Sequence, residues 1–448
     1  MGKVAQWRTI LQKSQRLVAV SKLSQAVAVL EAGLERFPNH VLILYRLGCI
    51  LQQQGHYAEA SEIFQKCLSL DPDAKEISLN LGALWALLGQ TDRAIALFEQ
   101  LIQQDPNFAK AYYNLARVYL ELQQWPQGED YLRKALQLRP NDPGYHVCLA
   151  YPCLRLGRYA EGFREYEWRL KLSSCKIKNM DLPMWDGSPM LGQTLLVLNE
   201  QGFGDLLQLA RYFAIIRPLV GRLLVQCQPA LLRLIRNLPA VDLAIPNGKP
   251  LPAAAAYVPV FSLPYLLTKD LSLIPKQMPY LFLKPTKKLE PNAAFSKICK
   301  VGLVWGSSPG FIDAKEKSIH LNRLAPVFNT PGVVFVSLQK GPQAADLTPE
   351  LPILPAAEKC KDFYDTALVI QTLDLLITVD TAVAHLAGAL GKPVWVLLSY
   401  RGDWRWMQDR CDSPWYPSMR LFRQKNPGDW SPVIDAVCQA LSGLVTEQ

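Results

Sequence analysis

Four prolines recur at one interval in the first third of the chain: Pro38, Pro72, Pro106 and Pro140 each lie 34 residues after the one before. Small residues follow the same interval as Leu47-Gly48, Leu81-Gly82, Leu115-Ala116 and Leu149-Ala150, and as Ala26, Ala60, Ala94, Gly128 and Gly162. Small side chains let helices approach closely, and proline ends the second helix of each unit. We therefore expect stacked helix pairs, each burying its apolar face only against the next.

This pattern resembles the tetratricopeptide repeat over about residues 7–170, and we assign residues 1–170 to a repeat array. Such arrays usually present a concave surface to a protein or peptide partner. Candidate residues for that surface lie in the first helix of a pair: Asn80, Tyr113, Asn114 and Arg117. The alternative is that the array is only a rigid support.

The composition predicts folded domains without a membrane span. The 448 residues are 50% hydrophobic and 19% charged, which suits two or three domains. No apolar segment follows Met1 as in a secretory leader, so we expect a cytoplasmic protein. The most apolar later stretch, 241–267, is broken by five prolines and cannot span a bilayer, which leaves peripheral membrane association open.

The number and spacing of cysteines, histidines and charged residues argue against disulfide, metal and nucleic-acid sites. Ten cysteines are scattered without a C-x-x-C pair and there are five histidines, so we expect neither a disulfide frame nor a metal site. The net charge of +9 is not gathered in a long basic run. It favours an anionic ligand, and we expect no nucleic-acid partner.

After a linker at 171–190, strand and helix patterns alternate in two blocks. In the first, 191–285, we expect strands at Thr194–Asn199, Arg222–Gln226, Asp242–Ile245 and Tyr257–Val260, and helices at Asp205–Arg217 and Pro229–Leu238. In the second, 286–448, we expect strands at Val301–Trp305, Val333–Leu338, Leu375–Val379 and Val394–Leu398, and helices at Leu321–Phe328, Asp362–Leu373, Ala382–Leu390 and Ser431–Leu444. The last helix should cross back toward the first block. The expected fold is an α-solenoid followed by two Rossmann-like, doubly wound α/β domains that face each other.

Two strand-to-helix turns mark the expected ligand site. Gly202 and Gly204 let the turn after the first strand come close to a ligand, and Asp205 follows at the start of a helix. In the second block Asp380 ends a strand and Thr381 can cap the helix that begins at Ala382. Free N–H groups at such helix starts favour an anion. The two turns together predict a cleft between two lobes.

The segment from about 190 to 430 resembles the GT-B glycosyltransferases of the heptosyltransferase group (glycosyltransferase family 9), particularly those fused behind tetratricopeptide repeats. The matching pieces are Glu200–Asp205, Gly302–Trp305, Ser337–Gly341 and Val379–Val394. A more distant similarity is to O-linked N-acetylglucosamine transferases. The resemblance implies metal-independent, inverting transfer of a sugar from a nucleotide-diphosphate donor to a protein or glycan acceptor, with no cofactor besides that donor.

The resemblance also implies roles for individual residues. Asp205 would be the catalytic base, held ionised by the helix dipole, and Glu200 is the rival base. Residues for binding the nucleotide sugar and its diphosphate would be Lys340, Asp380, Thr381, Ala382 and His385, and positive charge for the diphosphate would have to come from lysine, arginine, histidine or helix starts. The alternative is that Asp380-Thr381 is only a helix cap and His385 a core histidine.

Some residues depart from the family pattern. Gly306–Pro309 and Lys317-Ser318 stand where the fused relatives tend to have Asn-Pro and Arg-Ser, which puts a phosphate contact there in doubt. Ala382 replaces a glycine often found after the Asp-Thr pair. The rival function is therefore a non-catalytic scaffold with a degenerate transferase domain. A nicotinamide-dependent oxidoreductase ranks last, because the third glycine of its fingerprint is missing.

Two further features have a functional and a structural interpretation. An aromatic and basic stretch runs from Asp403 to Gln424, with tryptophan and arginine interleaved. It predicts a second-lobe loop near the cleft that could stack on a sugar or nucleotide, and the alternative is internal packing. Arg211, two turns into the first-lobe helix, could meet substrate or face solvent.

Overall fold

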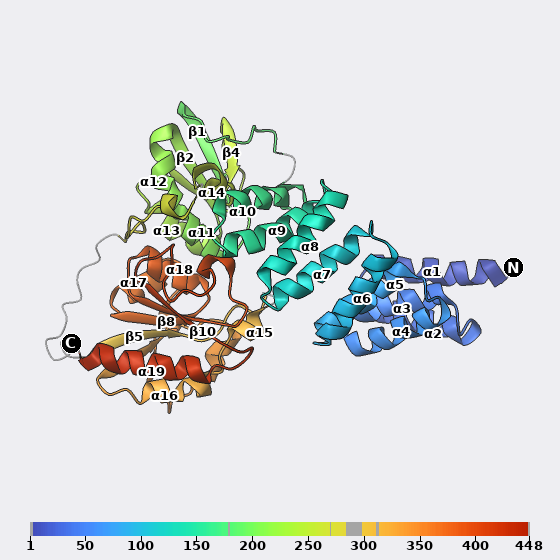
Figure 1. The fold of residues 1–448 in the computed structure, drawn as a ribbon. Helices are drawn as coiled ribbons and strands as arrows, with labels where there is room; N and C mark the ends of the chain where they lie inside the picture. Colours follow the sequence, from blue (N-terminus) through green and yellow to red (C-terminus); the bar gives the residue numbers. More distant parts are fainter. Residues whose placement is uncertain (1–2, 178–179, 269, 284–297, 311–312, 447–448) are drawn as a thin grey trace. The chain divides into compact units, whose positions relative to one another are not determined.

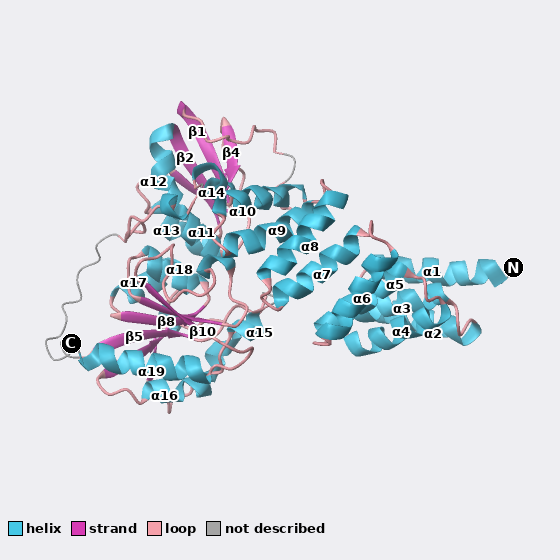
Figure 2. Ribbon diagram, in the orientation of Figure 1, coloured by secondary structure: helices cyan, strands magenta, loops and turns pink. Residues whose placement is uncertain are grey.

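The computed structural model describes residues 3–177, 180–268, 270–283, 298–310 and 313–446. Contacts divide the chain into two compact units, Met1–Pro152 and Cys153–Gln448. The first unit is helical and the second is built from strands and helices (Figures 1 and 2). The expected boundary between the two α/β blocks, at residues 285 and 286, lies outside the described residues.

The first unit consists of helices that pack in succession: α1 (Lys3–Ala19), α2 (Leu23–Arg36), α3 (Val41–Gln53), α4 (Tyr57–Leu70), α5 (Lys75–Leu87), α6 (Thr91–Gln104), α7 (Ala109–Glu121), α8 (Trp125–Leu138) and the larger part of α9 (Pro143–Arg155). The small and large positions of the repeat meet as expected. A Cβ atom at Gly48 would lie 2.5 Å from the Phe64 ring, and one at Gly82 would lie 2.6 Å from the Phe98 ring. Glycine at these positions lets neighbouring helices pack around a buried aromatic ring.

Two helices mark the boundary between the units. The C-terminal end of α9, from Cys153 to Arg155, and the whole of α10 (Tyr159–Tyr166) belong to the second unit. In sequence, α10 continues the repeat register through Gly162. The compact α/β unit therefore begins inside the segment that repeat spacing assigns to the array.

The second unit contains a four-stranded parallel sheet, ordered β3-β2-β1-β4. Its strands are β1 (Met190–Leu198), β2 (Val220–Cys227), β3 (Leu243–Pro246) and β4 (Ala256–Pro259). In register, Leu195 of β1 pairs with Leu223 on one side and Ala256 on the other. The buried parts of the central strands, 195–198 in β1 and 223–225 in β2, are continuous apolar runs, as is typical of a parallel sheet covered by helices.

The helices of this sheet are α11 (Phe203–Leu209), α12 (Phe213–Ile216), α13 (Leu232–Arg236) and α14 (Ser262–Leu267). The single helix expected at Asp205–Arg217 is thus two short helices joined by a 3₁₀ turn at Ala210–Tyr212.

A second, six-stranded parallel sheet has the order β10-β9-β8-β5-β6-β7. Its strands are β5 (Cys299–Val304), β6 (Val333–Ser337), β7 (Ile353–Pro355), β8 (Leu375–Val379), β9 (Val394–Leu398) and β10 (Met419–Arg423), of which β7 and β10 were not expected from the sequence. Read from β7, the chain order is 3-2-1-4-5-6, the order of doubly wound dinucleotide-binding sheets. In such sheets ligands bind where the order reverses, here between β5 and β8.

The helices around the second sheet are α15 (Ala314–Lys317), α16 (Ala325–Phe328), α17 (Phe363–Gln371), α18 (Ala382–Ala389) and α19 (Ser431–Thr446). The expectation that the last helix crosses back to the first lobe is wrong. Helix α19 packs against α16 and β10, and Val437 and Leu441 are buried in the core of the six-stranded sheet (Figure 1). The apolar face of α19 is buried against the second sheet of its own lobe.

Candidate functional site

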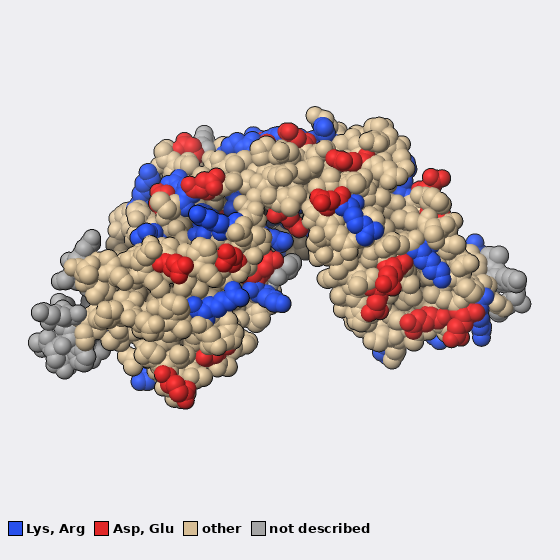
Figure 3. All heavy atoms as spheres, turned by 60° about the horizontal axis from the view of Figure 1, so that its bottom comes forward, with Lys and Arg blue, Asp and Glu red and all other residues tan. Residues whose placement is uncertain are grey.

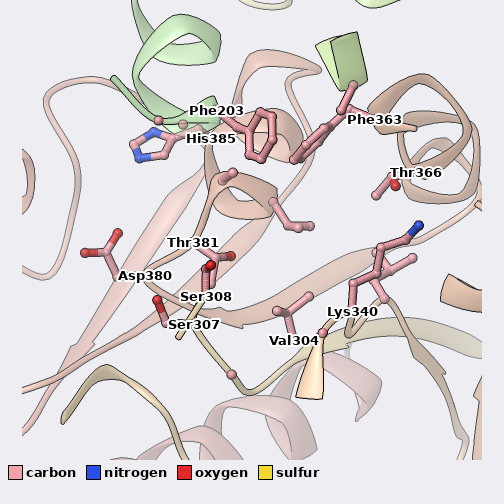
Figure 4. A pocket seen from close by; sticks show the side chains of 18 of the residues that line it. Phe203, Val304, Ser307, Ser308, Lys340, Phe363, Thr366, Asp380, Thr381 and His385 are labelled. Carbon is pink, nitrogen blue, oxygen red and sulfur yellow. The ribbon is translucent and has the colours of Figure 1, made fainter. Parts of the chain in front are cut away.

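A cavity of about 900 Å³ lies at the carboxyl ends of both sheets. It is lined by residues at the ends of, or following, β1, β2, β5, β6, β7, β8 and β9. All eight residues predicted from the sequence are among them: Gly202, Gly204, Asp205, Lys340, Asp380, Thr381, Ala382 and His385. Figure 4 shows Lys340 and Asp380 on opposite sides of the cavity, with His385 at another edge. The volume suits a nucleotide-sized ligand.

The start of α18 faces the cavity. Thr381 occupies the N-cap position, as expected, but its hydroxyl lies 3.1 Å from Thr378 Oγ1 and makes no capping bond to the helix. Ala382 and Val383 form the first turn and line the cavity. The first N–H groups of a helix have no acceptor within that helix, so this turn is suited to hold an anion.

His385 is buried and neutral. Burial lowers the pKa of its imidazole to about 3, and the positive charge of Arg405 acts in the same direction. Its Nδ1 lies 3.0 Å from the Tyr416 hydroxyl and its ring stacks on Trp406 with centroids 5.4 Å apart. A histidine that burial keeps neutral does not itself supply positive charge at neutral pH. A neutral imidazole that accepts from Tyr416 carries its proton on Nε2 and can donate one hydrogen bond.

Asp205 is held at both carboxylate oxygens. Oδ2 accepts from the backbone N–H of Gly202 at 2.7 Å, and Oδ1 accepts from Nη2 of Arg405 at 2.5 Å. Burial nevertheless raises the pKa of Asp205, against the opposing charge of Arg405. The helix start does not dominate this carboxyl group, contrary to the sequence-based expectation. A raised pKa makes the carboxylate a better proton acceptor at neutral pH.

Arg405 contacts residues of both lobes at the cavity. Besides Asp205 it donates to Asp403 Oδ1 at 2.8 Å and to Gln208 Oε1 at 2.6 Å. The charge of Arg405 lowers the pKa of Asp403 despite its burial. Sequence reasoning noted Arg405 only within an aromatic and basic stretch, because its partners lie about 200 residues away in the chain.

A second buried ion pair lies at the end of β8. Asp380 Oδ2 is 3.2 Å from Lys317 Nζ, which also contacts Asp313 at 2.8 Å. Burial raises the pKa of Asp380, against the effect of Lys317. The positions that depart from the family pattern thus reach the cavity. Ser307 and Ser308 line it (Figure 4), and so does Lys317.

Lys340 is positioned by the loop after β6. Its ammonium donates to the carbonyl of Cys360, and the residue is exposed. The preceding Gln339 is buried and its Oε1 accepts from the backbone N–H groups of Trp305 and Gly306 at 3.0 and 2.7 Å. Gln339 therefore joins the ends of β5 and β6 beneath the cavity, a role that its sequence context did not reveal.

Two aromatic rings cross the cavity between the lobes. Phe203 in α11 and Phe363 in α17 lie 5.0 Å apart at 48°, and both line the cavity (Figure 4). Near them Arg233 of α13 contacts Asp362 at 3.1 Å and Asp365 at 2.8 Å. Sequence reasoning missed this pair of contacts, since neither lobe alone indicates which residues face the other.

Several other candidates lie away from the cavity. Glu200, the rival base, accepts from Arg169 at 2.8 and 3.0 Å and does not line the cavity. Arg211 is 2% exposed and donates to the Trp415 carbonyl at 2.7 Å. The tryptophans of the aromatic stretch are buried, which favours the packing interpretation: Trp404, Trp406 and Trp415 are 8%, 0% and 0% exposed.

The candidate residues of the repeat surface have contacts within the array. Asn80 donates to the Tyr45 hydroxyl at 3.0 Å, and Tyr113 stacks on Tyr145 at 4.7 Å. The Arg117 guanidinium lies 5.9 Å from the centre of the Tyr113 ring. Asn80 and Tyr113 are partly exposed to solvent and Arg117 is exposed, whereas Tyr145 is buried. Figure 3 shows acidic and basic side chains interspersed over the face in view.

Two further observations concern metals and membranes. Within the described ranges, the histidine, cysteine, aspartate and glutamate side chains form no group of three or more that could hold a metal ion. Among the helices of those same ranges, none combines the length and apolar character needed to cross a bilayer.

Comparisons with known proteins bear on the repeat array. The Tetratricopeptide repeat family matches residues 45–107 and again residues 86–150. Protein FlbA of Caulobacter vibrioides is 29% identical over 320 residues, which is 64% of this chain and 53% of that protein. The chain thus spans about half the length of the curated relative it matches.

Solved structures resemble the chain over little more than a third of its length. MamA from Desulfovibrio magneticus is 27% identical, with 38% of this chain and 94% of that one covered and a TM-score of 0.32. A Thermus thermophilus tetratricopeptide protein is 21% identical, covering 37% and 91%, with a TM-score of 0.34. PilF of Pseudomonas aeruginosa is 20% identical, covering 36% and 73%, with a TM-score of 0.33. The matches of residues 45–150 to the repeat family confirm that the N-terminal region of this chain contains tetratricopeptide repeats.

Proposed function

We propose that this chain is a metal-independent glycosyltransferase of the GT-B type, which transfers a sugar from a nucleotide-diphosphate donor to a protein or glycan acceptor. One observation carries the proposal: a single cavity at the carboxyl ends of two parallel sheets, lined by all eight residues that the sequence resemblance singled out. Two sheets that share one cavity provide separate walls for donor and acceptor.

On the donor side, the diphosphate would bind at the start of α18. The N–H groups of Ala382 and Val383 and the positive end of the helix attract its oxygens. Lys340 would supply a positive charge, and neutral His385 would supply a hydrogen bond from Nε2 when its Nδ1 accepts from Tyr416. These groups would stabilise the charge that develops on the diphosphate as the bond to the sugar breaks.

On the acceptor side, Asp205 would take the proton of the acceptor hydroxyl while that oxygen forms a bond to the anomeric carbon. Its raised pKa favours proton uptake, and Gly202 and Arg405 fix its orientation. The nucleoside diphosphate leaves from the opposite face of the sugar, which gives inversion. The tetratricopeptide repeats would bind the protein acceptor or another protein partner.

One observation favours the alternative, a non-catalytic scaffold. Asp205 and Asp380 both form buried ion pairs, with Arg405 and Lys317 respectively. Such pairs can serve only to hold two lobes together. In that case the repeats would carry the function and the cavity would bind a nucleotide or nothing.

Thermal unfolding with nucleoside diphosphates and their sugars, in the absence of divalent metal, separates the two functions. Saturation at a hundred times the dissociation constant adds about 2.7 kcal/mol, a measurable shift in Tm. We expect one nucleotide to stabilise the protein, with the shift lost in Lys340→Ala and kept in the matched surface variant Lys359→Ala. Asp205→Asn should retain nucleotide binding and lose release of nucleoside diphosphate from the sugar donor in the presence of acceptor. The absence of any shift in the unaltered protein would favour the scaffold.

A further inference from the structure

Helix α10 continues the repeat pattern in sequence but packs as part of the α/β unit. Tyr159 and Phe163 are 0% and 1% exposed, and their ring partners Trp404 and Trp415 belong to the loops after β9. A repeat helix at the end of an array would ordinarily present a polar outer face to solvent. Here that face is covered by the loops that lead to the cavity.

The first set of contacts reaches the loop after β9. The Tyr159 hydroxyl accepts from Trp415 Nε1 at 3.0 Å, and the Phe163 and Trp404 rings meet edge to face at 5.7 Å. Just before α10, buried Arg155 donates from Nη1 to the carbonyl oxygens of Gly402 and Asp403 at 3.0 and 3.2 Å. Asp403 lines the cavity and holds Arg405.

The second set reaches the loop after β1, in the other sheet. The Tyr166 hydroxyl accepts from Gln201 Nε2 at 2.5 Å, and Gln201 lines the cavity. Three residues further on, Arg169 is 5% exposed and donates to both oxygens of Glu200 and to the Ser262 hydroxyl. The two ends of α10 therefore contact the loops that supply the two halves of the cavity.

We propose that α10 is a brace that sets the spacing of the two cavity walls, and that Tyr159 and Tyr166 are positioning residues for the site. The Asp205–Arg405 ion pair connects the first turn of α11, which follows the β1 loop, to the loop after β9, so it joins the same two cavity walls as the brace. Both residues of the pair line the cavity, whereas α10 does not. Only the consequence for ligand affinity rests on the proposed function. The brace itself is a property of the unliganded protein.

Hydrogen–deuterium exchange of the unliganded full chain tests the brace without any ligand. Tyr166→Phe removes the hydroxyl that Gln201 bonds, and Tyr159→Phe removes the acceptor of Trp415. A hydrogen bond contributes roughly 1 kcal/mol, so opening should become about fivefold more frequent. We expect faster exchange at 199–206 in Tyr166→Phe and at 402–416 in Tyr159→Phe. The matched variant Tyr119→Phe, in a tyrosine pair of the array, should leave both segments unchanged.

The same variants are then titrated with the nucleoside diphosphate that gives the largest thermal shift in the unaltered protein. Both should bind it measurably more weakly, with Tyr119→Phe unaffected, because a smaller fraction of the protein holds the cavity walls at the spacing that binds. Uniformly faster exchange over the whole α/β unit, or no local change in either segment, would overturn the brace. Local changes in exchange without binding of any nucleotide would support the brace and count against the proposed transferase. Local changes with unaltered nucleotide affinity would overturn the positioning role.

Discussion

Gly204 of α11 lies directly against the imidazole of His385 in α18. A Cβ atom built at this glycine would be 2.8 Å from Cδ2 of His385 and 3.5 Å from the Cα atom of Ala382. The two helices belong to different sheets, and their starts meet with no space for a methyl group. This contact brings the base candidate Asp205 and the first turn of α18 to one cavity.

Gly204→Ala should lower the free energy of unfolding by about 1–3 kcal/mol, because the new methyl group must displace the ring or the helix. His385→Ala removes the ring and so should suppress that cost. We expect the double variant to be more stable than the sum of the two single changes predicts. Urea denaturation of the four proteins measures this coupling. Additive effects would mean that the helices do not meet at this contact.

Stability should decline as the pH falls below the ordinary pKa of histidine, because His385 stays neutral in the folded protein. Its pKa in the fold is about 3, whereas in the unfolded chain it returns to about 6.5. Between these values the unfolded chain binds one more proton. The stabilisation present above pH 6.5 is therefore lost as the pH falls, at up to ~1.4 kcal/mol per pH unit.

Denaturation at pH 7.5 and pH 5.5 tests this dependence. The loss of stability on acidification should be smaller in His385→Gln than in the unaltered protein. His56→Gln, a change at an exposed histidine of the array, serves as the control and should keep the original dependence. An identical decline in all three proteins would assign the pH dependence to other groups.

The Asp205–Arg405 pair should contribute to stability as well as to any chemistry. Asp205→Ala leaves the buried Arg405 with Asp403 as its remaining carboxylate partner, which we expect to cost about 3 kcal/mol. Asp205→Asn keeps an oxygen that can accept from Gly202 or Arg405, so its cost should be smaller. The surface change Asp73→Ala should cost far less than either. Denaturant midpoints provide the comparison, and equal values for Asp205→Ala and Asp73→Ala would contradict the pairing.

The repeats and most strands were predictable because each depends on the spacing and hydrophobicity of residues close together in the sequence. The 34-residue spacing predicted the array. Apolar runs bounded by turn residues predicted eight of the ten strands that the described part of the chain forms. The three-residue β7 is too short to show a pattern. Strand β10 carries only three apolar residues between and beside two arginines, and it lies in an aromatic and basic stretch that we interpreted as a loop near the cleft.

The members of the site were also predictable, but not their charge states or partners. Parallel strands bring their carboxyl ends to one edge, so turns 180 residues apart could be placed together. The pKa values of His385 and Asp205 depend on burial between two lobes, which no local sequence records. Arg405 and Gln339 were missed for the same reason, since their roles are defined by distant contacts.

The turn between α7 and α8 provides a test of backbone strain within the array. Three equivalent turns place a glycine at positive φ: Gly55, Gly89 and Gly157, at 85°, 75° and 79°. Gln123 occupies the corresponding position with φ of 59°. A residue with a Cβ atom pays roughly 1–2 kcal/mol for this left-handed conformation, whereas glycine adopts it freely.

Gln123→Gly should therefore stabilise the protein by about 1 kcal/mol, after allowance for the greater freedom of glycine in the unfolded chain. The neighbouring Gln124 has φ of −85°, so Gln124→Gly makes the same chemical change without relieving strain and should destabilise by about 0.5–1 kcal/mol. Calorimetric and urea unfolding of both variants measure the difference in sign. Destabilisation of equal size in both would show that the side chain of Gln123 contributes more through its contacts than its backbone conformation costs.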